Sequence, residues 1–489
     1  MAPFLKKIQS QPFFLALMAL FFVAHGYNQN HASVTAMDFA VLLGEYWMGT
    51  ILVFLFGLLI YSKMVKAALF AFGLMFLELF FGPFHDGLKK ISPTFFLAKY
   101  SVLLPLLLLL TVVFVWWLKK THNSFHRLFA YLNGCFLLLL LIEVPSFFSG
   151  SQAPPKSGLP ACTTCRKPDV YLIIADSYSD SLALADALHF NNGAFLSQLR
   201  NRGFHVVEGS HSNYNYTPFA MSSLLQMNYL PGVRGYNSDK HDRDLCAGYI
   251  NRNPVVAFFR ENGYAIKNAS IFNLADEPTQ ARQNYLLLGK DLVRSQTFLQ
   301  RLQRDLGYHL VTTLNLQSAI ASYTFYTKKC NDKVLGLLRD EIGQRSQQPR
   351  FIYTHLLLPH YPYYYDQNGR ERPLSYFKAG YEFDQQAYLE YLQYGNGLFL
   401  RLIDAIFKNA TQPPIILLMG DHGFREFHPS RLPDPKYYYM NLNAVYLPDG
   451  NYQQFYKDLP AVNQFRALLN SAFGQHLPML KDSAVLIQE

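Results

Sequence analysis

The sequence predicts a two-part protein: an N-terminal domain of five transmembrane helices, and a C-terminal α/β domain whose mostly parallel sheet is covered by helices on both faces. The chain has 489 residues, of which 50% are hydrophobic and only 16% are charged. Long apolar stretches crowd into residues 1–149, whereas short apolar runs alternate with helical patterns after residue 167. Such a composition excludes a disordered chain and a coiled coil, and it is typical of a membrane part joined to a globular part.

Five apolar stretches fill the N-terminal domain. Four of them reach the roughly 20 residues that a helix needs to cross the hydrocarbon core of a bilayer. The first is shorter and follows Lys6 and Lys7, so a signal peptide with a poor cleavage site at Ala24-His25-Gly26 is an alternative interpretation. The predicted spans lie near 12–27, 39–61, 64–83, 95–118 and 127–149.

The basic residues of the loops predict the orientation of these spans. With the N-terminus inside, seven Lys and Arg residues lie on the inner side and three on the outer side, which satisfies the positive-inside bias. Five spans then place the α/β domain outside, and cleavage of the first segment would leave it there. We therefore expect an integral, multi-pass protein of the inner or cell membrane with its large domain on the periplasmic or extracellular side.

A few ionisable side chains fall inside the predicted spans. Most lie near span ends, where long side chains can reach the polar interface. Two glutamates, Glu78 and Glu143, could instead contact a lipid headgroup. The full set is Glu45, Lys66, Glu78, Lys99 and Glu143.

Residues 150–166 form the predicted linker between the two domains. This segment is rich in Ser, Gly and Pro, which mark a surface connection rather than a helix or strand. The α/β domain is therefore expected at 167–489.

Four of the five cysteines follow the last predicted span, and an outer location permits disulfides. Four cysteines allow three pairings. We favour Cys162 with Cys165 and Cys246 with Cys330. The fifth, Cys135, lies in a span and is expected to pack as an apolar residue.

Strands and helices alternate along the α/β domain. Short apolar, β-branched runs predict strands, and longer stretches with apolar residues at helical spacing predict helices. This alternation indicates a mostly parallel sheet, in which ligands bind at the carboxyl ends of the strands. The predicted strands are 169–175, 204–207, 351–358, 415–419 and 442–447, and the predicted helices are 217–228, 254–262, 385–408 and 460–473.

Two predicted strands end in residues that could bind a metal ion. Asp176 directly follows the strand 169–175, and Asp421 and His422 follow the strand 415–419 within a glycine-flanked turn. Oxygen and nitrogen ligands of this kind suit Zn²⁺ or Mn²⁺. Each residue alone has an ordinary alternative as a turn or capping residue, so the metal site is indicated by the combination.

Thr217 precedes Pro218 at the predicted start of a helix. A threonine N-cap before a proline is a strong helix start, and capping is therefore the structural interpretation. The same position would place a hydroxyl at a helix N-terminus, where anions are stabilised and a metal-bound hydroxyl could attack phosphorus. In that interpretation Asn213 and Asn215 could donate to the non-bridging oxygens.

Three histidines stand near the same predicted strand ends. His355 and His360 belong to the segment around 351–360, and His428 follows the Asp421-His422 turn. As donors they could hold a phosphate or protonate a leaving group. Ordinary surface histidines are the alternative.

The order of these features resembles the membrane-anchored branch of the alkaline-phosphatase/sulfatase superfamily, in particular the phosphoethanolamine transferases and lipoteichoic acid synthases. The resemblance rests on five spans, a linker, a first strand ending in Ala175-Asp176-Ser177, a later Thr217, a His360-Tyr361-Pro362 segment and a late Asp421-His422-Gly423. It implies one divalent metal, Zn or Mn, held by Asp176, Thr217, Asp421 and His422. It further implies that Thr217 is the nucleophile and that His360 contacts the substrate phosphate, with His355, His428, Asn213 and Asn215 as further candidates for substrate binding.

Two departures from the family pattern bear on this expectation. The transferases place Glu where this chain has Asp176, and their Asp-His-Gly is typically followed by Glu where this chain has Phe424. Sulfatases need a Cys or Ser in a motif with Pro and Arg, which the Thr217-Pro218 segment lacks, so sulfate-ester hydrolysis is disfavoured.

The resemblance implies a metal-dependent transferase that moves a phospho-headgroup, of the phosphoethanolamine or glycerol phosphate type, from a phospholipid to an outer-leaflet glycolipid or glycan through a phospho-threonine. A metal-dependent phosphodiesterase that uses water, and a catalytically degenerate lipid-binding regulator, are the alternatives. The net charge of +9 is spread over both parts of the chain without a basic stripe, so no nucleic-acid partner is expected.

Overall fold

The computed structural model describes residues 11–30, 34–92, 95–149, 156–163, 165–233, 240–274, 277–283, 287–430 and 432–488. Positions 150–155 of the predicted linker lie outside these ranges. The chain forms two compact units. The first, here called the membrane unit, comprises Met1–Gln152 and Leu287–Ile320. The second, the globular unit, comprises Ala153–Leu286 and Ala321–Glu489, so the expected α/β domain is interrupted by a segment that packs with the first unit.

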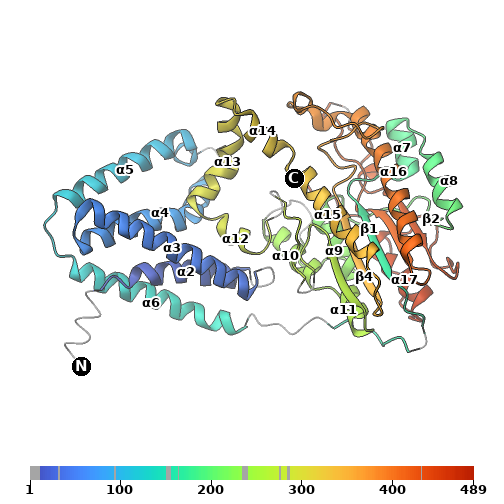
Figure 1. Cartoon of the computed structure of the whole chain (residues 1–489), viewed down its shortest axis with the longest axis horizontal. Coiled ribbons are helices and arrows are strands. Elements are labelled where there is room, and N and C mark those ends of the chain that lie inside the picture. The colour runs from blue at the N-terminus through green and yellow to red at the C-terminus, as the bar shows by residue number, and fades with distance from the viewer. Residues whose placement is uncertain are drawn as a thin grey trace. The chain divides into compact units, whose positions relative to one another are not determined.

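The membrane unit contains the predicted apolar helices (Figure 1). Among the described residues, four helices are long and apolar enough to cross a membrane, and α2 is shorter, with 16 residues. Only 11% of the apolar window is buried in α3, in α5 and in α6, against 50% in α4, as expected if α4 is central and the others face lipid. The bounds are α2 Phe14–Gln29, α3 Ala36–Tyr61, α4 Met64–Ile91, α5 Tyr100–Lys120 and α6 His126–Ser149, with α12 Lys290–Arg294 and α13 Phe298–Thr313 from the later segment.

Helix α4 runs to Ile91, well beyond the predicted end of its span at residue 83. Proline inside a helix normally removes a backbone hydrogen bond and clashes with the preceding turn. Here the N–H of Gly82 donates to the carbonyl of Gln296 at 2.8 Å, and beyond Pro83 the ring of His85 is hydrogen-bonded to the carbonyl of Ala98 at 2.8 Å. Contacts with distant segments therefore stabilise the extension, which apolar periodicity alone does not indicate.

A six-stranded sheet forms the centre of the globular unit, in the order β2-β6-β5-β1-β4-β3. Strands β1, β3, β4 and β5 pair in parallel, and β6 pairs antiparallel with both β5 and β2. The sheet is thus mixed, with β6 as the one reversed strand. The bounds are β1 Val170–Ala175, β2 His205–Val206, β3 Ala265–Ala269, β4 Arg350–Leu356, β5 Ile415–Gly420 and β6 Asn443–Tyr446.

Helices cover both faces of this sheet, as predicted. On one face, β1 residues such as Ile173 join a buried cluster with side chains of α7, α8, α15 and α16. On the other, Phe351 of β4 stacks on Phe259 of α11 at 4.5 Å and lies 6.3 Å from Phe465 of α17. The helices of the unit are α7 Ser181–Leu188, α8 Gly193–Asn201, α9 Thr217–Gln226, α10 Lys240–Asn251, α11 Pro254–Glu261, α14 Gln317–Thr324, α15 Tyr326–Gly343, α16 Gln385–Asn409 and α17 Gln464–Ala472, with α14 beginning in the segment assigned to the membrane unit.

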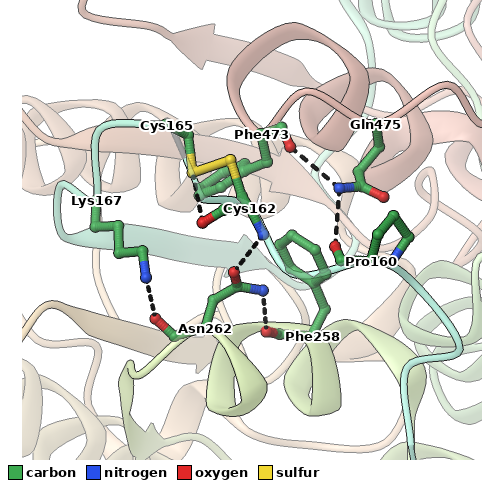
Figure 2. Close-up of a disulfide and its surroundings, with 8 residues drawn as sticks. All are labelled: Pro160, Cys162, Cys165, Lys167, Phe258, Asn262, Phe473 and Gln475. Atoms are coloured by element: carbon green, nitrogen blue, oxygen red, sulfur yellow. Dashed lines mark hydrogen bonds between the residues drawn. A yellow bond between two sulfur atoms is a disulfide. The ribbon is translucent and has the colours of Figure 1, made fainter.

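The disulfide Cys162–Cys165 fastens the start of the globular unit, and this predicted pairing is confirmed. Figure 2 shows its surroundings: Asn262, just after α11, accepts from the N–H of Cys162 at 2.8 Å, and its carbonyl accepts from Lys167 at 2.9 Å. Gln475 donates to the carbonyl of Pro160 at 3.1 Å. The disulfide loop is therefore held against α11 and the segment after α17.

The second predicted disulfide is wrong. Cys246 and Cys330 are both free and buried. Cys246 lies on α10 in an apolar cluster with Tyr214 and Phe219. Cys330 lies on α15, and its thiol donates a hydrogen bond to the carbonyl of Arg282 at 2.9 Å. Each cysteine is packed into a different part of the unit, so an outer location permits but does not require pairing.

Candidate functional site

Three neighbouring parallel strands bring the predicted site residues together. Strand β1 lies between β4 and β5, with Ala175 opposite Gly420 and Ile174 opposite His355. Asp176 and Asp421 are the next residues after this register, so both leave the sheet at the same edge. The parallel pairing thus explains why residues far apart in the sequence form one cluster, here called the strand-end cluster: Asp176, Thr217, His355, Asp421 and His422.

The four residues expected to hold a metal ion lie close together around His422. His422 Nε2 is 3.2 Å from Thr217 Oγ1, 3.4 Å from Asp421 Oδ2 and 3.9 Å from Asp176 Oδ1. In a tetrahedral site with metal–ligand bonds of about 2.0–2.1 Å, neighbouring ligand atoms are about 3.3 Å apart. The spacing of these side chains therefore suits a small divalent cation such as Zn²⁺.

His355 belongs to the same cluster, although it was expected to contact substrate. Its Nε2 is 3.5 Å from Asp176 Oδ2, and one ligand atom each from Asp176, His355 and Asp421 all lie within 4.8 Å of one another. His355 Nε2 and Asp421 Oδ2 are buried and have no hydrogen-bond partner. Buried polar atoms rarely remain unsatisfied in folded proteins, so these two atoms indicate a position for a ligand.

The turn after β5 fixes the orientation of Asp421. Its Oδ1 accepts from the N–H groups of Ser177 and His422, both at 2.9 Å, which leaves Oδ2 directed to the cluster. A Cβ on Gly423 would lie 2.1 Å from the carbonyl oxygen of Tyr437 and 2.7 Å from that of Met440. Glycine is therefore required at this position for the backbone to approach so closely.

The hydrogen bonds of His422 identify which ring nitrogen carries the proton. Its Nδ1 lies 2.7 Å from the carbonyl oxygen of Gly423, which can only accept. Nδ1 is therefore the protonated nitrogen of the neutral ring, and the lone pair of Nε2 faces Thr217 and the two carboxylates. This is the arrangement in which histidine binds a metal.

Thr217 begins helix α9 but does not cap it. The capping position is Tyr216, and Thr217 Oγ1 is directed to His422 rather than to the helix backbone. The expected free N–H groups are also in use, because Phe219 and Ala220 both donate to the carbonyl of Tyr216. Thr217 thus presents a buried hydroxyl whose described contact is His422.

Electrostatics favour the ionised form of Asp176. Burial by itself would raise the pKa of Asp176, but the nearby imidazoles of His360, His355 and His422 together hold that pKa well below its usual range. Burial lowers the pKa of His360, and the carboxylates of Asp176 and Glu426 outweigh this effect and raise it. The site therefore pairs a carboxylate that stays charged with a histidine that favours protonation.

His360 lies beside the cluster rather than in it. Its backbone N–H donates to the carbonyl of Asp176 at 3.1 Å, and its Nδ1 is hydrogen-bonded to the carbonyl of Tyr361. Because a carbonyl can only accept, Nδ1 carries a proton, and Nε2 faces the buried Glu426 at 4.0 Å. Its expected contact with a substrate phosphate stays a prediction. The sequence analysis did not identify Glu426 as a neighbour of His360.

The other three residues expected to contact substrate have partners elsewhere. His428 is exposed and hydrogen-bonded to Ser430 at 2.7 Å. The amide of Asn213 donates to the carbonyl of Ser483 at 2.8 Å, and that of Asn215 exchanges hydrogen bonds with the backbone of Ile487. These bonds give both asparagines a structural role in holding the C-terminal segment, which differs from the expected role toward phosphate.

Tyr353 was missed by sequence reasoning. Its hydroxyl is 3.1 Å from Nδ1 of His355, and the side chain is fully buried. Burial, with smaller effects from the carboxylates of Asp421 and Asp176, raises the pKa of Tyr353 well above its usual value, so the phenol stays neutral. Residues two apart on a strand share a face, so the spacing Tyr-Thr-His in the sequence already indicates that Tyr353 and His355 are neighbours.

No protein-family model and no curated protein matches the chain. Solved structures do. Lipooligosaccharide phosphoethanolamine transferase A of Neisseria meningitidis, an integral membrane protein, is similar over 95% of both chains, with 11% identity and a TM-score of 0.39. The periplasmic domain of EcEptC from Escherichia coli covers 66% of this chain and 86% of its own, with 14% identity and a TM-score of 0.40. The match to the phosphonate monoester hydrolase of Agrobacterium radiobacter covers 62% of this chain and 73% of the hydrolase, with 12% identity and a TM-score of 0.38. At such identities the chemistry has to be judged from this chain's own residues.

Proposed function

We propose that this protein is a membrane-anchored, metal-dependent transferase that moves a phospho-headgroup, of the phosphoethanolamine or glycerol phosphate type, from a phospholipid to an outer-leaflet glycolipid or glycan. The observation that carries the proposal is the strand-end cluster, in which a buried threonine hydroxyl lies 3.2 Å from a histidine that faces two aspartates. Two buried ligand atoms in this cluster lack partners. A purely structural cluster would satisfy them internally.

Asp176, Thr217, Asp421 and His422 would hold the cation, with His355 as an additional ligand. The donor set of oxygens and imidazole nitrogens suits Zn²⁺ or Mn²⁺. When bound, such an ion supplies Lewis-acid stabilisation of negative charge and lowers the pKa of a coordinated hydroxyl. The residues present thus fit a single divalent metal ion.

The reaction would then proceed in two displacements at phosphorus, the first by Thr217 and the second by the acceptor hydroxyl. Thr217 Oγ1 gives up its proton to water and forms a bond to phosphorus, while the bond from phosphorus to the diacylglycerol oxygen breaks with its electron pair. His360, which favours protonation, donates the proton that the departing oxygen needs. In the second displacement an acceptor hydroxyl returns a proton to His360 and attacks phosphorus, while the bond from phosphorus to Thr217 Oγ1 breaks with its electron pair and that oxygen takes back a proton from water.

The membrane unit explains why this chemistry would be attached to a bilayer. A phospholipid donor and a glycolipid acceptor both reside at the membrane surface, so an anchor confines the enzyme to the layer that holds its substrates. The orientation predicted from the loop charges places the globular unit outside, with the outer leaflet. The site itself would serve equally well for a phosphodiesterase, in which water replaces the acceptor.

The test is mass spectrometry of the full-length protein, reconstituted with a headgroup-labelled phospholipid and no acceptor. We expect the label on the peptide that contains Thr217, and its transfer to lipid once an outer-leaflet glycolipid is added. Rapid release of free phospho-headgroup, without any acceptor, would instead establish the hydrolase. No turnover with Zn²⁺ or Mn²⁺, and no bound metal, would overturn both in favour of a non-catalytic lipid-binding protein.

A further inference from the structure

The segment Leu287–Ile320 lies between β3 and β4 in the sequence, yet it belongs to the membrane unit. Helix α12 and the turn after it pack against two glycines on different apolar helices of the membrane unit. A Cβ on Gly26 of α2 would lie 2.7 Å from the side chain of Val293, and one on Gly82 of α4 would lie 2.5 Å from the carbonyl oxygen of Gln296. Larger residues at either glycine would push the segment out.

Ion pairs and hydrogen bonds reinforce this docking. Arg294 of α12 pairs with Glu45 of α3, with its Nε 3.1 Å from the carboxylate. Arg301 of α13 forms two hydrogen bonds with the carboxylate of Asp86 on α4, at 2.8 and 2.6 Å. Both acidic partners lie near the ends of spans that the loop charges place outside.

The first turn of α13 lies at the depth of a residue inside a predicted span. The N–H of Leu299 donates to Glu78 of α4 at 3.2 Å, and Glu78 falls within the predicted span 64–83. Tyr100, at the outer start of α5, donates to Asp305 at 2.6 Å. The glutamate considered above as a headgroup contact is therefore a docking residue, and the first turn of α13 lies beside a part of α4 that is predicted to span the membrane.

Helix α13 is amphipathic, and its polar face is the one that docks. Arg301 and Asp305 lie on the side that contacts the spanning helices. Leucines recur on the other side at helical spacing, at positions 299, 302, 306 and 310, and continue with Leu314 and Leu316 after the helix. Leu299, Leu310 and Leu314 are 63%, 55% and 65% exposed.

This leucine face is unusual for the described residues beyond the spanning helices. Among the described residues after α6, nine large apolar side chains are exposed, and five of them, four leucines and Tyr308, fall within the eighteen positions 299–316. The other four are spread over the rest of the chain. Exposed apolar patches of this density mark a binding surface.

The geometry points to the outer leaflet of the membrane as the partner of this face: α13 is an interfacial helix whose leucines contact lipid acyl chains while its polar face is fastened to the spanning helices. Two observations favour lipid over other occupants. Helix α13 packs on α4 in the same unit, in which α3 and α5 expose most of their apolar side chains, and its first turn is hydrogen-bonded to Glu78. The arrangement is that of an amphipathic helix lying in the interface plane, and it does not depend on the proposed reaction.

The test uses nitroxide spin labels on the full-length protein in phosphatidylethanolamine/phosphatidylglycerol nanodiscs, with Cys135→Ala as background. Labels are placed at Leu310→Cys on the leucine face and at Arg304→Cys on the opposite side of the same helix as the matched control. We expect the Leu310 label to collide several-fold more often with oxygen, which concentrates in lipid, than with a water-soluble nickel chelate, and the Arg304 label to show the reverse.

Two outcomes would overturn the inference. Equal access of nickel to the labels at 310 and 304 would place the leucine face in water. Protection of the Leu310 label from both reagents would show that protein covers it. Leu314→Cys, beyond the last turn of α13, replaces Leu310→Cys if that variant melts below the parent protein, so the measurement remains decisive.

Discussion

The two units of this protein bury charged groups in opposite ways. In the strand-end cluster of the globular unit, two aspartates and two histidines converge, and Asp421 Oδ2 and His355 Nε2 remain without partners. In the membrane unit, the buried guanidinium of Arg301 has hydrogen bonds to Asp86, Gln296 and the carbonyl of Ser295. An unsatisfied buried polar atom costs about 1–3 kcal/mol. The comparison teaches that complete pairing marks a structural contact, whereas an unpaired set marks a place where a ligand supplies the missing bonds.

Thr217→Ala tests the functional side of this comparison and should have the largest effect. Removing the attacking oxygen should lower turnover by roughly 10³-fold or more and abolish the labelled peptide, because loss of a nucleophile removes the covalent route. Thr217→Ser keeps the oxygen and should retain part of the activity. Unchanged turnover of the alanine variant in the labelled-phospholipid assay would show that Thr217 is not the nucleophile.

Asp421→Asn tests in stability measurements whether the strand-end cluster, unlike the paired contacts of the membrane unit, needs a ligand to satisfy its charges. It removes one of two adjacent buried carboxylates, so the metal-free protein should melt at a higher temperature because their mutual repulsion is relieved. The rise in melting temperature on adding Zn²⁺ or Mn²⁺ should disappear, since a roughly 100-fold weaker affinity removes about 2.7 kcal/mol of ligand stabilisation. Loss of stability without metal would mean that Asp421 is a structural residue.

A second buried aspartate provides the control. Asp180 caps α7 through the N–H of Leu182, and burial raises the pKa of its carboxyl to about 6. Since this pKa is above that of the unfolded chain, stability falls as the pH rises from about 4 to 6, and Asp180→Asn should remove that fall. The variant should gain up to about 3 kcal/mol at pH 7 and keep the full metal-dependent shift.

Tyr353→Phe should have a smaller effect on the same site. Its hydroxyl contacts His355 Nδ1 and orients the ring, so its removal should weaken metal affinity by roughly 10- to 100-fold in competition with a chelator. Tyr364→Phe is the matched control, because that buried hydroxyl donates to the carbonyl of Thr324. Equal metal affinity of the Tyr353 variant and the parent would remove the positioning role.

The sequence predicts the convergence of Asp176 and Asp421 better than it predicts several other features of the structure, for a physical reason. Asp176 and Asp421 follow buried apolar strands directly, and parallel pairing brings such strand ends together whatever the intervening chain does. Strand β3 was missed because Lys267 and Asn268 interrupt its apolar run, although the parallel pairing with β4 stabilises it.

The segment Leu287–Ile320 could not be placed from its own sequence. Its leucine spacing indicates an amphipathic helix but does not say which surface the polar face contacts. Docking depends on Gly26 and Gly82, more than 200 positions away, and on acidic residues that in the sequence look like ordinary charges at span ends. The same limit applies to Asn213 and Asn215, whose bonds to residues 483–487 form only in the folded chain.

The smallest expected effect lies in the paired contact of the membrane unit, and a double-mutant cycle of Arg301→Gln and Asp86→Asn measures it. Arg301 is 6% exposed but Asp86 is 43% exposed, so water can solvate the carboxylate that the single Arg301 change leaves behind. Each single change should therefore cost about 1–2 kcal/mol, less than the 3–5 kcal/mol typical of a fully buried pair. The double change should cost less than the sum of the two, because no unpaired charge remains. Melting of the detergent-solubilised protein gives these values, and strictly additive losses would show that the pair contributes nothing specific to docking.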